Sequence, residues 1–196
     1  DNDGSARDIV FNLANNTNSA VMVAKWNGTS FDTTRITFGR TQRYRGVAIG
    51  DIVPELPGNE IYVTGGYDIA MAYWDGTSWA AQVLTTGLTA CYDIAIGDVD
   101  PNLPGDEIAI VHSSTSYQVS VTNYVDGTFY IRAWTLYSTW GTQNSDIDIG
   151  DFLREMPGNE VVLSNTSTTA TAYSLWFSIL PGGTAYVGTL PKVATG

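Results

Sequence analysis

The stretch VAIGDIVPELPGNEIYV, residues 47–63, decides the fold because the chain contains it three times. The other two copies are IAIGDVDPNLPGDEIAI at 94–110 and IDIGDFLREMPGNEVVL at 147–163, and a weaker copy, DNDGSARDIVF, occupies 1–11. The shared Gly-Asp pairs recur at roughly 47 to 53 residues, which indicates a repeat architecture. Repeat architectures typically offer extended binding surfaces, so the repeat argues against a single catalytic centre.

Each unit is predicted to form four short antiparallel strands, and the second unit shows this most clearly. Its apolar run at 44–49 ends at Gly50-Asp51, and further strand patterns follow at 60–63, 69–74 and 77–84. Asp-Gly and Asn-Gly tolerate the positive φ angles of type I′ hairpin turns. No segment keeps a helical period over ten or more residues. The sequence therefore predicts an all-β fold of about four units, typical of propeller blades, with a solenoid of stacked sheets as the alternative.

Aromatic residues flank two of the hairpin turns. The turns read WNGTSF at 26–31 and WDGTSW at 74–79. Cross-strand aromatic pairs contribute up to about 1 kcal/mol relative to a pair of alanines. We expect Trp26 to pair with Phe31, and Trp74 with Trp79, mainly to hold the sheets together.

The unit resembles the FG-GAP and VCBS repeats of extracellular β-propellers, the family that includes the integrin α-chain head. The matching features are an apolar run closing on Gly-Asp, an Asp/Asn/Gly-rich loop, an acid heading a second apolar run, and an Asp-Gly-Thr turn. The resemblance covers nearly the whole chain as one repeat domain, 1–196, with units at about 1–43, 44–91, 92–144 and 145–196. It implies that 44–49, 92–97 and 145–149 are the innermost strands of three four-stranded blades.

The same register leaves the first unit without an innermost strand. Its remaining strands are predicted near 8–13, 20–26 and 29–37. An unpaired innermost edge is a liability in a sheet. We therefore expect the chain to be part of a larger propeller or assembly, with another segment or another chain supplying the strand. A self-contained ring of four blades is the alternative.

The resemblance also implies calcium binding by the loops that follow Gly-Asp. Calcium takes six to eight oxygen ligands, which alternate along such a loop. The third unit fits best, and the first unit supplies a second set. The candidate ligands are Asp98, Asp100, Asn102, Asp106 and Glu107, and then Asp1, Asp3, Ser5 and Asp8.

The other two loops lack a central ligand, because Val53 and Leu153 stand where the third unit has Asp100. For 51–60 and 151–160 the sequence favours turns that order the hairpin, with Asp51 and Asp151 accepting backbone N–H groups. For 98–107 the calcium site and the ordering turn both stay open.

Composition narrows the classes of partner. Nine basic and twenty acidic residues give a net charge of −11, which disfavours nucleic acid. No run approaches the length of a membrane span. Cys91 and His112 are the only cysteine and histidine, so thiol and histidine-based catalysis are poorly supported. Three sequons, at Asn15, Asn27 and Asn165, are candidate glycosylation sites.

These features predict a non-enzymatic binding or adhesion module, located outside the cell or at its surface, with a protein or glycan ligand. One alternative is a structural subunit of an extracellular filament or surface layer that assembles through the open strand edge. Another is the propeller of a polysaccharide lyase or glycosidase. The repeat-equivalent Glu60, Glu107 and Glu160 should then lie one per blade, a placement typical of structural residues and unlike a catalytic pair.

Overall fold

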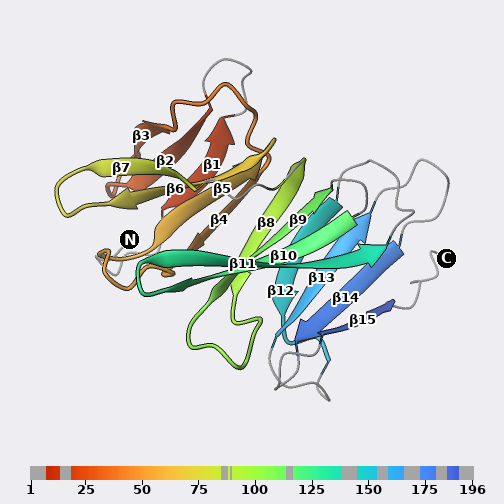
Figure 1. Ribbon diagram of the computed structural model, residues 1–196. Helices are drawn as coiled ribbons and strands as arrows, with labels where there is room; N and C mark the ends of the chain where they lie inside the picture. The colour runs from red at the N-terminus through yellow and green to blue at the C-terminus, as the bar shows by residue number, and fades with distance from the viewer. Residues whose placement is uncertain are drawn as a thin grey trace. The chain divides into compact units, whose positions relative to one another are not determined.

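The computed structural model describes residues 8–13, 19–84, 88, 90–113, 117–137, 145–153, 159–165, 173–179 and 185–189. All of its regular secondary structure is β-strand (Figure 1), so the predicted all-β class is confirmed. The chain divides into two compact units, Asp1–Cys91 and Tyr92–Gly196. None of the described residues forms a helix long and apolar enough to cross a membrane.

The first unit contains a three-stranded and a four-stranded antiparallel sheet, each with its strands in chain order. The strands are β1 (Ile9–Leu13), β2 (Ala20–Trp26) and β3 (Phe31–Thr37), then β4 (Gly46–Gly50), β5 (Glu60–Gly65), β6 (Asp68–Trp74) and β7 (Trp79–Leu84). Each lies within about two residues of its predicted position, because the alternating apolar pattern and the Asn-Gly and Asp-Gly turns mark both ends of each hairpin.

The second unit contains two four-stranded antiparallel sheets, again with the strands in chain order. The strands are β8 (Cys91–Gly97), β9 (Glu107–Ser113), β10 (Tyr117–Val125) and β11 (Thr128–Tyr137), then β12 (Ser145–Gly150), β13 (Glu160–Asn165), β14 (Tyr173–Ile179) and β15 (Ala185–Thr189). The predicted strands at 92–97 and 145–149 are β8 and β12, and each forms one edge of its sheet.

Each unit has an apolar core between its two sheets. In the first unit, Val21 and Val23 of β2 pack in the same cluster as Ile61 and Val63 of β5. In the second unit, residues of β10 and β13 form the equivalent cluster. Every residue of β5 is buried, which explains its continuous apolar run: both faces of this strand are covered.

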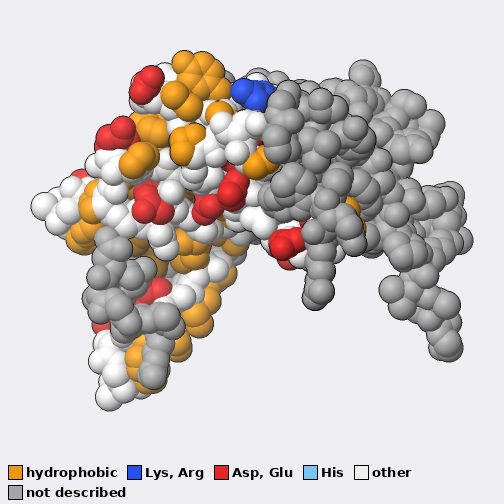
Figure 2. Space-filling model, turned by 90° about the horizontal axis from the view of Figure 1, so that it is seen from below, with side chains coloured by type: hydrophobic (Ala, Val, Ile, Leu, Met, Phe, Trp, Pro, Cys, Tyr) orange, Lys and Arg blue, Asp and Glu red, His pale blue; other side chains and the backbone are white. Residues whose placement is uncertain are grey.

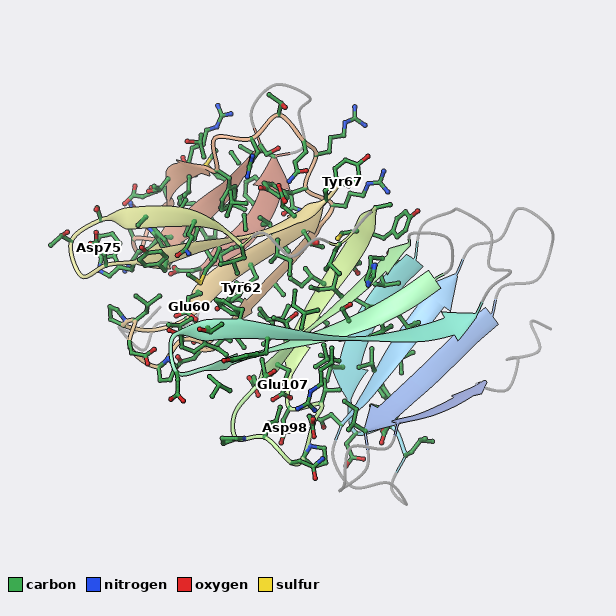
Figure 3. The ribbon with its side chains drawn as sticks, in the orientation of Figure 1. Glu60, Tyr62, Tyr67, Asp75, Asp98 and Glu107 are labelled. Carbon is green, nitrogen blue, oxygen red and sulfur yellow. The ribbon has the colours of Figure 1, made fainter. Side chains whose placement is uncertain are left out.

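The predicted aromatic pairs are present. Trp26 lies opposite Phe31 with ring centroids 5.1 Å apart, and Trp74 lies opposite Trp79 at 6.0 Å, both edge to face. Asp75 holds the turn between Trp74 and Trp79, and it lies at the tip of this hairpin (Figure 3). Its Oδ1 accepts the backbone N–H groups of Thr77 and Ser78, both at 2.8 Å. The hydrogen bond from the Ser78 N–H has the largest effect on the pKa of Asp75. Together with the hydrogen bonds from Thr77 it lowers that pKa to about 2.

Candidate functional site

One glutamate in each complete repeat closes the loop between the first two strands of its sheet. We call Glu60, Glu107 and Glu160 the clamp glutamates; all three are buried. In each, Oε2 accepts two consecutive backbone N–H groups from the residues that follow Gly-Asp, at 2.9–3.1 Å. The donors are Ile52 and Val53 for Glu60, Val99 and Asp100 for Glu107, and Phe152 and Leu153 for Glu160.

The clamp holds a buried acid in an environment that opposes its ionisation. Desolvation raises the pKa of Glu107 to about 7, although the N–H groups of Asp100 and Val99 favour the charged form. Burial raises the pKa of Glu60 as well, against the same kind of hydrogen bonds. The Tyr62 hydroxyl adds a third donor to Glu60, at 3.1 Å, and both side chains come from β5 (Figure 3).

The aspartates of Gly-Asp were expected to take these backbone N–H groups, but it is the glutamates that accept them. A signal for this was present in the sequence. Each glutamate stands nine residues after the aspartate of its Gly-Asp pair and heads an apolar strand, where an unpaired carboxylate would be costly. That spacing is identical in all three copies, which points to one shared partner within the loop.

The predicted calcium ligands of the third unit lie in one loop, but the carboxylate oxygens of Asp100 and Glu107 accept hydrogen bonds from N–H groups. Asp100 is buried, and its Oδ1 accepts the backbone N–H of Asn102 at 3.0 Å and the side-chain amide of Asn102 at 2.6 Å. Its Oδ2 pairs with Nη1 of Arg132 at 3.1 Å. Glu107 is held by the clamp, and Asp98 and Asp106 are exposed; Figure 3 labels Glu107 and Asp98.

This geometry fits a loop whose two buried carboxylates are satisfied internally better than it fits a calcium site. An arginine beside Asp100 supplies the positive charge that a cation would bring. Within the described ranges, no group of three or more acidic, histidine or cysteine side chains is arranged to hold a metal. Of the first-unit candidates, Asp1, Asp3 and Ser5 lie outside the described residues, and Asp8 is half-buried. Calcium binding by either loop stays a prediction.

Two of the three sequon asparagines, Asn27 and Asn165, lie among the described residues. Asn27 is exposed, but its side chain orders the hairpin turn: Oδ1 accepts the N–H of Ser30 at 2.9 Å, and Nδ2 donates to Asp32 at 3.0 Å. A glycan on Nδ2 would compete with that bond. Asn165 ends β13, and Asn15 lies outside the described residues.

The sole cysteine and histidine are both buried within strands. Burial raises the pKa of the Cys91 thiol, which opposes formation of the thiolate. Burial lowers the pKa of His112 to about 4, and its Nε2 lies 2.8 Å from Oγ of Ser120. The expected structural role of Cys91 is consistent with its burial.

A groove of about 1170 Å³ opens between the two sheets of the first unit. One wall carries Trp74, Ser78 and Trp79 from the β6–β7 hairpin, and the other carries Lys25, Thr34 and Arg35 from β2 and β3. Apolar side chains of the unit's core form the base. Sequence reasoning missed this groove, since it requires knowing that two sheets pack face to face. The only sequence feature that pointed to the groove was the pair of tryptophans, Trp74 and Trp79, that flank a hairpin turn.

Comparison with models of known protein families gives no match, and no curated protein matches the chain in sequence. The resemblance to FG-GAP and VCBS repeats therefore stays a prediction that rests on the repeated motif.

Proposed function

We propose that this chain is a non-enzymatic β-propeller module, located outside the cell, that binds a neutral carbohydrate in the groove of the first unit. The observation that carries the proposal is the composition of that groove. Two indole rings stand beside hydroxyl and amine groups over an apolar base. Concave sites of this size, with aromatic walls and a few polar groups, are typical of small-ligand binding.

Sugar rings match this combination because they present apolar faces and hydroxyl edges. The face of a pyranose can pack on an indole, while Ser78, Thr34 and Lys25 donate or accept hydrogen bonds at its edge. Trp74 is partly exposed, so it can be reached from solvent. The net charge of −11 repels a long polyanion, whereas the groove itself contains Lys25 and Arg35 beside Asp8, so the comparison of neutral and anionic polymers is central to the test. Figure 2 shows acidic side chains spread over one face, with little basic surface among its described residues.

Binding is favoured over glycoside hydrolysis by the carboxylates that the groove contains. Hydrolysis of a glycosidic bond ordinarily uses two carboxyl groups that flank the bond. Asp8 is the one acid among the described lining residues. The clamp glutamates are committed to backbone N–H groups inside their loops, where they serve the fold.

The test is affinity electrophoresis of the intact chain in gels containing soluble neutral glucans, xylans or mannans, with polygalacturonate as the anionic comparison. We expect retardation by at least one neutral polymer and none by polygalacturonate. Trp74→Ala should weaken binding about tenfold or more, equivalent to roughly 1.4 kcal/mol. Trp26→Ala is the matched control, because Trp26 forms the same kind of hairpin pair outside the groove. Equal loss in both variants, or no retardation by any neutral polymer, would overturn the proposal.

A further inference from the structure

The first strand, β1, forms an edge that its counterparts in the other sheets do not have. In the three four-stranded sheets, the equivalent strands β5, β9 and β13 each lie between two neighbours. Among the described residues, the backbone of β1 pairs only with β2, and the Asn12 side chain of β1 donates to the carbonyl of Arg45 at 2.7 Å. Its other side therefore presents unpaired backbone N–H and C=O groups, which readily accept a further strand.

Two apolar side chains of β1 are exposed, whereas their counterparts in β5 are buried. By position in the repeat, Ile9 and Phe11 correspond to Ile61 and Val63 of β5. The exposed fractions are 51% for Ile9 and 42% for Phe11, against 2% for Ile61 and 0% for Val63. Large apolar side chains so exposed on a short edge strand indicate a surface that another segment covers.

Asp8, at the start of β1, marks this strand as the counterpart of β5, β9 and β13. Asp8 occupies the place of the clamp glutamates, directly before the apolar run. Its Oδ1 is buried and has no hydrogen-bond partner within the part of the chain that the structure describes. Among the described residues, Oε1 of Glu60 and of Glu160 is likewise buried without a partner, so Asp8 shares this feature with the clamp glutamates.

Residues 193–196 resemble in sequence the strand that pairs with β5. That strand, β4, reads Val-Ala-Ile-Gly at 47–50, and residues 193–196 read Val-Ala-Thr-Gly. The equivalent stretches are Ile-Ala-Ile-Gly at 94–97 and Ile-Asp-Ile-Gly at 147–150. Residues 193–196 thus match β4 at three of four positions, which makes them a candidate strand for the open edge of β1.

We propose that the open edge of β1 binds residues 193–196 of a second copy of this chain as an antiparallel strand. The known pairs fix the register. Gly50 lies opposite Glu60 and Ile49 opposite Ile61, and Gly150 lies opposite Glu160. By the same alignment, Gly196 pairs with Asp8, Thr195 with Ile9, and Val193 with Phe11. Donor and acceptor are different surfaces of one chain, so the contact is heterologous and links copies head to tail.

Disulfide trapping between two singly substituted chains tests both the register and the donor. One chain carries Thr195→Cys, and the other carries Ile9→Cys. Directly opposed strand residues have Cα atoms about 4.5–5.5 Å apart, within the range of a disulfide. Phe11→Cys is the offset control, since diagonal residues lie about 7–8 Å apart. The native Cys91 is buried, and a chain without added cysteines measures its background.

We expect the mixed chains to give a disulfide-linked dimer through residues 9 and 195, at least several times faster than the offset pair. Light scattering should show association that increases with concentration and is lost when 193–196 are deleted. Thr195→Ile, which recreates Val-Ala-Ile-Gly, should strengthen association. Equal trapping at both positions overturns the proposed register. Trapping only within a single doubly substituted chain, or a monomer at all concentrations, overturns donation by a second copy.

Discussion

Replacing Glu107 by glutamine should change how the stability of the protein depends on pH. Burial holds the pKa of Glu107 at about 7, above the ordinary 4.5. A carboxyl whose pKa is raised on folding binds more protons folded than unfolded between these two values. Its contribution is therefore full below about pH 4.5 and is lost as the pH rises towards 7. The gap corresponds to about 3 kcal/mol in the free energy of unfolding.

His112 acts in the opposite direction over nearly the same range. Its pKa falls from 6.5 to about 4 on burial, so the folded state binds fewer protons than the unfolded state. Its contribution is present above about pH 6.5 and is lost as the pH falls towards 4. The effects of Glu107 and His112 on the free energy of unfolding largely offset each other in the native chain. The pH profile of the native chain alone could therefore be flat, so a variant is needed to separate them.

The assay is urea unfolding of the native chain and Glu107→Gln at intervals from pH 4.5 to 7.5. Glutamine keeps the shape and an acceptor oxygen for Val99 and Asp100 but cannot ionise. We expect the native chain to lose up to about 3 kcal/mol relative to the variant as the pH rises. Glu55→Gln, an exposed site in the second repeat's loop, should leave the profile unchanged. A difference between native and Glu107→Gln that stays constant with pH, or grows in favour of the native chain, refutes the reasoning.

Two further predictions concern packing and the calcium loop. Gly65→Ala should destabilise the first unit by several kcal/mol in urea unfolding, because the added Cβ would collide with the backbone of Arg43 and Tyr44; an unchanged midpoint would contradict that contact. Asp100→Ala should lower the melting temperature by removing the partner of Arg132 and Asn102, and by the same amount with and without millimolar calcium. Stabilisation of the native chain by calcium that Asp100→Ala abolishes would restore the metal site.

The strands were predictable because their signals are local. Alternating apolar residues and turns such as Asn27-Gly28 and Asp75-Gly76 fixed the hairpins, and with them the Trp74–Trp79 pair. The repeat fixed the number of sheets, since every copy of the motif had to adopt one structure.

The loop chemistry was harder to predict because it depends on atoms brought together by packing. The spacing of Asp98, Asp100 and Asn102 suited calcium, but Arg132, 32 residues beyond Asp100, lies against the central carboxylate. The sequence pattern also could not distinguish an acid that accepts backbone N–H groups from one that binds a metal. Glu107 and Asp98 are both acidic residues next to the same loop. The structure distinguishes them, because Glu107 is buried and Asp98 is exposed.

The repeated glutamate of each complete unit acts as a structural clamp on its loop. Amide hydrogen exchange, followed residue by residue by NMR, measures this directly. The amides of Ile52, Val53, Val99, Asp100, Phe152 and Leu153 should be protected in the native chain. Glu60→Ala, Glu107→Ala and Glu160→Ala, which remove the acceptor, should each speed exchange mainly at the two amides of its own loop. Rapid exchange of all six amides in the native chain, or protection unchanged by all three substitutions, would contradict the clamp.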